Sequence, residues 1–439
     1  MLHYDRDAIT LSVIHPVKRL RHLDPTSGSN FRQNIVNDTE PVKLFFVSDQ
    51  KIGASNPVSP TLLRKLLLSL KTRISWSLVP MFHRTDDLRI RSTEVVVPPA
   101  VLEKELPETE TASSTVYYAR KEICEILRGK DPRLLVVVGP CSIHDTKSAR
   151  EYARLLKGAM NDLSEQLCIV MRVYFEKPRT TIGWKGLLND PHLDESFKIN
   201  DGLRLARHLL LDLAEMGVPA GTEFLDTFTP QYVTGLVSWG AIGARTTESQ
   251  VHRQLVSGLS CPVGFKNGTS GNVQIAIEAV LSAAHPHTFL GHTKEGRSAI
   301  FVTTGNADCH VILRGGRRTV NYTADSVAQV SQQLEAAGLE PHVMIDCSHA
   351  NSDKDYTRQA FVCRDVARQI TKEGRNILGV MLESNIIAGA QKLVEGQPLV
   401  YGQSITDGCI GWDETLWLLR ELADAVRSGR SHQQKKEEV

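Results

Sequence analysis

Between positions 134 and 382 the hydrophobic residues fall into eight short runs, separated by longer stretches of helical composition. The runs are unbroken and rich in β-branched residues, which is typical of strands buried on both faces in a parallel sheet. The pattern therefore predicts eight strand–helix units. The runs are LLVVVG (134–139), LCIVMRVYF (167–175), PAGTEFL (219–225), AIGART (241–246), CPVGFK (261–266), HVILRG (310–315), HVMID (342–346) and ILGVML (377–382).

Eight such units predict an α/β fold, a closed (β/α)8 barrel of the TIM type. A barrel of this kind takes about 250 residues, which residues 134–425 supply. An open doubly wound sheet is the alternative, but no G-x-G-x-x-G turn follows the first run. The stretch 288–303 (TFLGHTKEGRSAIFVT) between units five and six is expected to be an inserted β-hairpin.

The texture of the chain changes near residue 85. We expect a poorly ordered basic extension over 1–84, the barrel over 85–430 and a polar, charged tail over 431–439. Within the extension, 61–70 (TLLRKLLLSL) has the pattern of a short basic amphipathic helix that could lie on a membrane or act in targeting. Scattered aspartates over 1–40 disfavour an acid-poor transit peptide.

Composition excludes some classes of function. With 439 residues, 41% hydrophobic and a net charge of +1, the chain has no global field that would attract nucleic acid or a membrane. No apolar run reaches the roughly 18 residues of a membrane-spanning helix. The eight cysteines include no CxxC pair, so a reducing, cytoplasmic location is expected.

Charged residues stand at or just beyond the ends of the runs. The carboxyl ends of all barrel strands lie on one face, where active sites form. Arginine and lysine there would bind phosphate or carboxylate groups, which predicts a small, highly anionic substrate, although each cation alone could be a solvated surface charge. The six cations are Arg172, Lys177, Arg179, Arg245, Lys266 and Arg314.

A second set is made of possible metal ligands: Cys141, His349, Glu383 and Asp407. One thiolate, one imidazole and two carboxylates suit a single divalent ion, and this mixture does not choose among Mn, Fe, Co and Zn. These four residues are far apart in the sequence, so only the closing of a barrel would bring their side chains together. Local context alone equally allows a buried cysteine, a helix-capping aspartate and two surface residues.

Several longer motifs resemble those of one enzyme family. The chain is similar to the type I 3-deoxy-D-arabino-heptulosonate-7-phosphate (DAHP) synthases, feedback-regulated enzymes that open the shikimate pathway, from about Asp86 to about Ser428. The residues before 85 fall outside the resemblance. The motifs are GPCSIHD (139–145), MRVYFEKPRTTIGWKG (171–186), SWGAIGARTTESQVHR (238–253), GFKNGT (264–269), ILRGG (312–316), DCSHAN (346–351), LESN (382–385) and SITDGCIGW (404–412).

The resemblance implies a role for particular residues. It places the metal site on Cys141, His349, Glu383 and Asp407 and makes Lys177, Glu223 and Asp407 catalytic, with Glu223 positioning the attacking water. Phosphoenolpyruvate would be bound by Arg172, Lys177, Gly243, Ala244, Arg245, Lys266 and Arg314. Erythrose 4-phosphate would be bound by Lys177, Pro178, Arg179, Thr180 and Asp407.

The implied reaction joins carbon 3 of phosphoenolpyruvate to the aldehyde of erythrose 4-phosphate, with water adding at carbon 2 and phosphate leaving. Lys177 would either donate a proton to the new alkoxide or act as a fixed charge. The alternatives are 3-deoxy-octulosonate-8-phosphate synthase, a synthase for a modified aldose phosphate, and a non-catalytic regulatory paralogue. A partner that is nucleic acid or membrane is not expected.

The resemblance also implies feedback inhibition by an aromatic amino acid and a homodimer or homotetramer. In the family the position of Gly291 tends to be serine in phenylalanine-sensitive forms and glycine in tyrosine-sensitive forms, so the resemblance favours tyrosine as the inhibitor, with the missing side chain leaving room for a phenolic hydroxyl. The alternative is that this glycine serves a turn with positive φ. The implied effector positions are Asp86, Asp87, Gln231, Leu255, Leu259, Ser260, Phe289 and Gly291.

Overall fold

The computed structural model describes residues 85–179, 183–317, 319–373, 376–394 and 396–437. The expected extension over 1–84 lies outside these described residues. By its internal contacts the chain divides into two units, residues 1–90 and residues 91–439. All helices and strands named here belong to the second unit.

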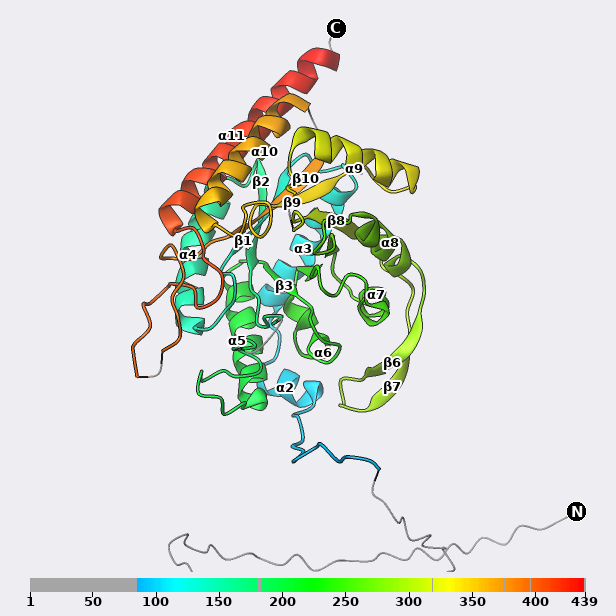
Figure 1. Cartoon of the computed structure of the whole chain (residues 1–439), viewed down its shortest axis with the longest axis vertical. Coiled ribbons are helices and arrows are strands. Elements are labelled where there is room, and N and C mark those ends of the chain that lie inside the picture. The colour runs from blue at the N-terminus through cyan, green and yellow to red at the C-terminus, as the bar shows by residue number, and fades with distance from the viewer. Residues whose placement is uncertain (1–84, 180–182, 318, 374–375, 395, 438–439) are drawn as a thin grey trace, which may run out of the picture. The chain divides into compact units, whose positions relative to one another are not determined.

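Eight parallel strands close into a barrel (Figure 1), which confirms the fold predicted from the sequence. Strand β1 pairs with β2 on one side and with β10 on the other, and this pairing closes the sheet. In order around the barrel the strands are β1 (Leu134–Gly139), β10 (Ile377–Glu383), β9 (Val343–Asp346), β8 (Cys309–Leu313), β5 (Val263–Lys266), β4 (Trp239–Ile242), β3 (Ala220–Glu223) and β2 (Leu167–Arg172).

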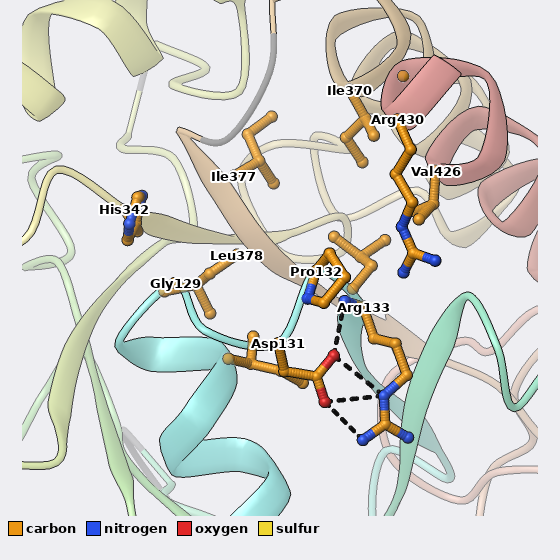
Figure 2. A pocket seen from close by; sticks show the side chains of 13 residues that line it. Gly129, Asp131, Pro132, Arg133, His342, Ile370, Ile377, Leu378, Val426 and Arg430 are labelled. Carbon is orange, nitrogen blue, oxygen red and sulfur yellow. Dashed lines mark hydrogen bonds and ion pairs between the residues drawn. The ribbon is translucent and has the colours of Figure 1, made fainter. Parts of the chain in front are cut away.

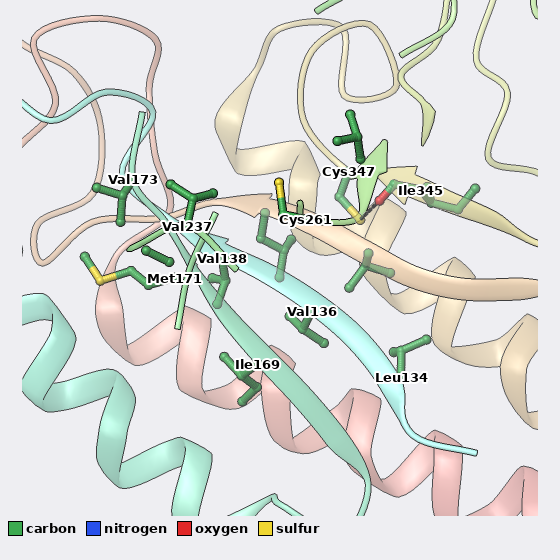
Figure 3. Packing of buried hydrophobic residues seen from close by; sticks show 14 of the residues in the cluster. Leu134, Val136, Val138, Ile169, Met171, Val173, Val237, Cys261, Ile345 and Cys347 are labelled. Carbon is green, nitrogen blue, oxygen red and sulfur yellow. Dashed lines mark hydrogen bonds between the residues drawn. The ribbon is translucent and has the colours of Figure 1, made fainter. Parts of the chain in front are cut away.

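Alternate residues of each strand face opposite sides of the barrel wall. On β1, Leu134, Val136 and Val138 pack outward in a cluster that includes residues of the surrounding helices (Figure 3). Leu135 and Val137 belong to a second buried cluster, together with residues of other strands. Both faces of the strand are thus apolar, which explains why the runs in the sequence are continuous.

Helices follow the strands, and α10 and α11 pack against each other along the barrel (Figure 1). Side-chain caps fix several of their starts; for example, Asp145 accepts hydrogen bonds from the first backbone N–H groups of α4. The helices are α2 (Pro99–Glu105), α3 (Glu110–Leu127), α4 (Thr146–Asp162), α5 (Ile199–Glu215), α6 (Pro230–Val233), α7 (Gln250–Val256), α8 (Gln274–Ala283), α9 (Ala324–Ala336), α10 (Gln359–Glu373) and α11 (Trp412–Glu437).

The expected hairpin insertion is present between α8 and β8. It consists of the antiparallel strands β6 (Thr288–His292) and β7 (Ser298–Val302), and its turn contains Gly296 with a φ of 74°. Near the turn, Lys294 Nζ lies 2.5 Å from Glu103 Oε1 of α2. The hairpin therefore contacts the rest of the unit through this ion pair near its turn, as well as through its connections to α8 and β8.

Some boundaries differ from the runs in the sequence. Strand β2 ends at Arg172, and β4 begins at Trp239 and ends at Ile242, so Arg245 lies three residues beyond its strand. Helix α11 continues to Glu437, so 431–437, expected as part of a tail, continue this helix. None of the helices in the described part of the chain combines the length and the hydropathy that a membrane span requires.

Candidate active site and metal centre

Three of the four expected metal ligands meet at the carboxyl ends of the strands. Cys141 follows β1, Glu383 ends β10, and Asp407 lies in the segment between β10 and α11. One donor atom from each lies within 4.8 Å of the others. His349 lies beside this group, with Nε2 at 4.0 Å from Glu383 Oε1. A thiolate with two carboxylates and an adjacent imidazole is a donor set that fits one divalent transition metal.

The backbone and a buried carboxylate orient His349. Its φ of 57° is unusual for a residue with a side chain, and such conformations cluster at functional sites. Its Nδ1 lies 2.9 Å from Oδ2 of the fully buried Asp346, so Nε2 faces Glu383. Carboxylates commonly hold metal-binding histidines in this way. Asp346 also pairs with Lys266 Nζ at 3.0 Å, which links the donor group to a buried cation.

Two basic side chains contact the donor group. Lys177 Nζ donates hydrogen bonds to Cys141 Sγ and to Asp407 Oδ2, both at 2.8 Å. Arg172, which is buried, donates to Glu383 Oε1 at 3.0 Å and lies over the ring of Tyr174. The side chains of Lys177 and Arg172 therefore offset part of the negative charge of the possible metal ligands.

The pKa values reflect this balance of burial and charge. Burial, with Glu383 nearby, raises the pKa of the Cys141 thiol to about 11. Burial opposes ionisation of Glu383 and Asp407, but the surrounding positive groups outweigh it and lower the pKa of each carboxyl. Burial would lower the pKa of Lys177, but Cys141, Glu383 and Asp407 outweigh it and raise that pKa. Lys177 is thus an ammonium at neutral pH.

Most of the residues expected to bind phosphoenolpyruvate lie on the same face of the barrel. Lys266 and Arg314 are buried at the ends of β5 and β8, and burial lowers the pKa of Arg314. Arg245 is exposed and donates to the carbonyl oxygen of Pro178 at 3.4 Å. At Gly243 a Cβ would lie 2.2 Å from Glu223 Oε1, so the carboxylate of Glu223 lies directly against the backbone at this position. The next residue, Ala244, is half-buried.

The side chain of Arg179 makes its hydrogen bond within its own segment of the chain. Its Nε donates to the backbone oxygen of Trp184 at 2.8 Å, within its own segment, and the side chain is exposed. Thr180 lies outside the described residues. The assignment of both to erythrose 4-phosphate stays a prediction.

The residues expected to bind the effector, where they fall in the second unit, lie on the hairpin, on α6 and on or just after α7. Phe289 and Gly291 are on β6, Leu255 is on α7 with Leu259 and Ser260 just after it, and Gln231 is on α6. Asp86 and Asp87 belong to the first unit. Their joint role stays a prediction.

Gly291 has a packing function that the sequence did not indicate. It lies within a strand, its φ is not positive, and the turn glycine of the hairpin is Gly296 instead. A Cβ at position 291 would stand 2.2 Å from ring carbons of Phe301 on the paired strand. The space freed by the missing side chain is therefore filled by Phe301.

A pocket at the opposite end of the barrel is separate from this site (Figure 2). It is lined by residues at the starts of β1 and β10, near the ends of α3 and α10, and within α11. In it the Asp131 carboxylate pairs with the Arg133 guanidinium at 2.6 Å. None of the predicted site residues lines this pocket.

Sequence reasoning missed two residues of the site. Asp346, which pairs with both Lys266 and His349, is the last residue of the seventh apolar run, whose pattern predicts only a strand. Glu176 lies inside the motif MRVYFEKPRTTIGWKG next to Lys177, is almost fully buried, and was given no role. Both are charged residues at or directly after the end of an apolar run, a position that marks a candidate but does not show which face the side chain takes.

A barrel face that gathers possible metal donors and buried cations is typical of a metal-dependent enzyme of the (β/α)8 class that acts on anionic substrates. Residues 105–420 match the model of the DAHP synthetase I family. The chain belongs to this family.

Relatives and a solved structure agree with this membership. The Phe-sensitive phospho-2-dehydro-3-deoxyheptonate aldolase of Escherichia coli K12 is 59% identical over 350 residues, which cover 80% of this chain and all of that protein. The tyrosine-inhibited enzyme of Schizosaccharomyces pombe is 51% identical over 79% of this chain and 95% of its own length. The structure of the aldolase of Francisella tularensis SCHU S4 has a TM-score of 0.76 and 53% identity, covering 77% of this chain and 99% of that chain.

Proposed function

We propose that this chain is a 3-deoxy-7-phosphoheptulonate synthase, which condenses phosphoenolpyruvate with erythrose 4-phosphate and water to give DAHP and phosphate. The observation that carries the proposal is the contact of Lys177 with Cys141 and Asp407, beside the buried cations of the same barrel face. This contact joins a metal donor group to a group that binds anions. Relatives that are 50% to 59% identical are named for the same activity.

The described residues divide the work of the reaction. The buried cations Lys266 and Arg314, with Arg245 at the surface, would bind the phosphate and carboxylate of phosphoenolpyruvate and offset the repulsion between two anionic substrates. Lys177 holds a proton at Nζ and would place positive charge beside the aldehyde of erythrose 4-phosphate. Glu223, which lies against Gly243, would orient the water that adds at carbon 2.

Cys141, His349, Glu383 and Asp407 would hold one divalent ion, which as a Lewis acid polarises a carbonyl oxygen when bound. The identity of the ion among Mn, Fe, Co and Zn is not fixed by this donor set. Asp346 orients the imidazole, and Arg172 fixes Glu383.

Replacing Lys266 with alanine is expected to raise the KM for phosphoenolpyruvate about 10- to 100-fold, with a smaller change in kcat. The reason is the loss of one charge-assisted contact to an anion, which contributes about 1.5–3 kcal/mol. Steady-state kinetics with erythrose 4-phosphate at saturation measures both constants. A large fall in kcat with an unchanged KM would contradict this assignment.

We further propose feedback inhibition through the hairpin region, with tyrosine as the inhibitor. Tyrosine is expected to inhibit phosphoenolpyruvate consumption more strongly than phenylalanine or tryptophan at equal concentration. Replacing Gly291 with serine would push against Phe301 and is expected to weaken inhibition while leaving uninhibited kcat within about twofold. Stronger inhibition by phenylalanine in the unaltered protein would refute the preference for tyrosine.

We also infer a homodimer or homotetramer and a cytoplasmic location. One face of the hairpin exposes Leu290, Ile300 and Val302, and clustered apolar side chains of this kind often contact another subunit. All eight cysteines are free, which supports a reducing compartment.

The choice of aldose is tested by comparing substrates. Purified protein would be supplied with phosphoenolpyruvate and either erythrose 4-phosphate or arabinose 5-phosphate, and the loss of phosphoenolpyruvate followed. Consumption with erythrose 4-phosphate alone supports the proposal. Consumption with arabinose 5-phosphate alone would assign the chain to the octulosonate branch, and consumption with neither would point to a modified aldose or a non-catalytic role.

A further inference from the structure

The two buried cations of the barrel face lie at the ends of neighbouring strands. Lys266 is the last residue of β5, and Arg314 directly follows β8. The two strands pair in parallel, and the pairing continues past Lys266 because the Asn267 N–H donates to the oxygen of Ile312 at 3.0 Å. The position of one cation relative to the other therefore depends on how the segments just after β5 and β8 are held together.

The side chain of Asn267 joins these two segments, and this residue is 0% exposed. Its Oδ1 accepts a hydrogen bond from the Arg314 N–H at 2.8 Å, and its Nδ2 donates to the oxygen of Gly315 at 3.1 Å. Nδ2 also donates to the oxygen of Gly268 at 2.9 Å. From its place next to Lys266, Asn267 thus holds the backbone that carries Arg314.

The partners of Asn267 require an amide at this position. A backbone N–H can only donate and a backbone carbonyl oxygen can only accept, so the partners fix which end of the amide is Oδ1 and which is Nδ2. Aspartate at this position would set a carboxylate oxygen against the Gly315 oxygen. Alanine would leave the Arg314 N–H and the Gly315 oxygen without this side-chain partner in the interior, which is costly. The residue is therefore required for its hydrogen bonds and not only for its volume.

Two further asparagines extend the contact to β9. Asn321 Nδ2 donates to Asn267 Oδ1 at 3.2 Å, and Asn321 Oδ1 accepts from the Gly315 N–H at 2.7 Å. The Asn321 N–H donates to Asn351 Oδ1 at 2.9 Å. Asn351 Nδ2 in turn donates to the oxygen of Asp346, the last residue of β9, at 2.9 Å. The hydrogen bonds thus run from the end of β5, across the end of β8, to the end of β9.

We propose that Asn267 is a positioning residue: its amide fixes Arg314 relative to Lys266 and so preforms the cationic site for the phosphate and carboxylate of phosphoenolpyruvate. The identity of this ligand rests on the proposed function. Asp346 completes the arrangement, because its carboxylate pairs with Lys266 Nζ at 3.0 Å. Groups that are already in place bind an anion without a cost of reorganisation, so the loss of Asn267 is expected to weaken anion binding.

The first test compares Asn267→Ala with Asn306→Ala, a control that alters the same two strands at their opposite ends. Asn306 is also buried; its Nδ2 donates to the Cys261 oxygen just before β5, and its Oδ1 accepts from the Asp308 N–H just before β8, each at 3.0 Å. Both variants leave buried backbone groups without a side-chain partner, so both are expected to lower the melting temperature.

The kinetic constants are expected to separate the two variants. N267A is expected to raise the KM for phosphoenolpyruvate about 10-fold, with kcat within about threefold of wild type and the KM for the aldose unchanged. N306A is expected to keep all three constants within about twofold. A loss of general stability would act on both variants alike. Equal changes of KM in the two variants, or a fall confined to kcat in N267A, would overturn the proposal.

The second test measures binding without turnover. Wild-type protein and the variants would be titrated calorimetrically with phosphoenolpyruvate alone and with inorganic phosphate alone. N267A is expected to bind each anion about 10-fold more weakly, and N306A as tightly as wild type. Asn321→Ala removes only the half-buried link to Asn267 and is expected to weaken binding about threefold, so it decides the question if N267A does not fold. Unchanged affinities in N267A and N321A would overturn the proposal.

The two tests separate the possible failures. Wild-type protein that binds either anion but consumes no phosphoenolpyruvate with the aldose would refute the proposed reaction, and the affinities of N267A and N306A would still decide the role of Asn267. Wild-type protein that binds neither anion would refute both, because the barrel face would then hold no preformed anion site.

Discussion

Lys177→Met is expected to lower kcat about a thousandfold, within the range of effects seen when a positioned proton donor or a fixed charge is removed. The ammonium contacts Cys141 and Asp407, each at 2.8 Å, and methionine fills a similar volume without the charge. The loss should fall mainly on kcat, because Lys177 lies at the metal donor group, whereas other cations remain to bind phosphoenolpyruvate. Steady-state kinetics at saturation with both substrates measures this effect.

Lys185→Met provides a matched control for this variant. Lys185 lies on the same segment, but its side chain is exposed, so kcat is expected to stay within about twofold. Circular dichroism would show that both variants are folded. A K177M protein that keeps more than about a tenth of the wild-type kcat would mean that Lys177 supplies neither the proton nor an essential charge.

Cys141→Ala is expected to lose bound metal and to lower activity about a thousandfold. Removing the thiolate leaves two carboxylates and an imidazole, which bind a soft divalent ion less tightly. A loss of about 4 kcal/mol of transition-state stabilisation corresponds to this factor. Metal content after dialysis, measured by elemental analysis, gives a readout that is independent of activity.

Cys261→Ala is the control for this second prediction. Cys261 is also a buried free cysteine, but it lies just before β5 and outside the donor group, so its loss should affect packing and leave metal content unchanged. If C141A retained a full equivalent of metal while C261A did too, Cys141 would not be a ligand, and the donor group would have to be redefined.

The sequence indicated the barrel and the hairpin because burial on both faces leaves a continuous apolar signature. It did not indicate where each strand ends. Strand β2 ends at Arg172, but the apolar run continues to Phe175. The run continues because Val173 to Phe175 stay buried after the pairing with β3 has ended. Hydrophobicity reports burial, and it does not report hydrogen bonding between strands.

The sequence indicated some residues of the candidate site and not others, because it shows which residue types follow a strand but not how their side chains are arranged. Cys141, Glu383 and Asp407 lie close together, with His349 beside them, and their role as metal ligands stays a prediction. Asp346 was overlooked because a residue at the end of a strand gives no sign of which face it takes. The room expected at Gly291 is occupied by the ring of Phe301, and the sequence could not show this because the packing depends on the register of two strands.

The stoichiometry of phosphoenolpyruvate loss and phosphate release with erythrose 4-phosphate, before and after chelation and after Mn²⁺ is restored, tests the proposed function most directly. The expected result is equal amounts of both, only when the aldose is present, with activity abolished by the chelator and recovered with the ion. Release of phosphate without the aldose, or no reaction after the ion is restored, would contradict it.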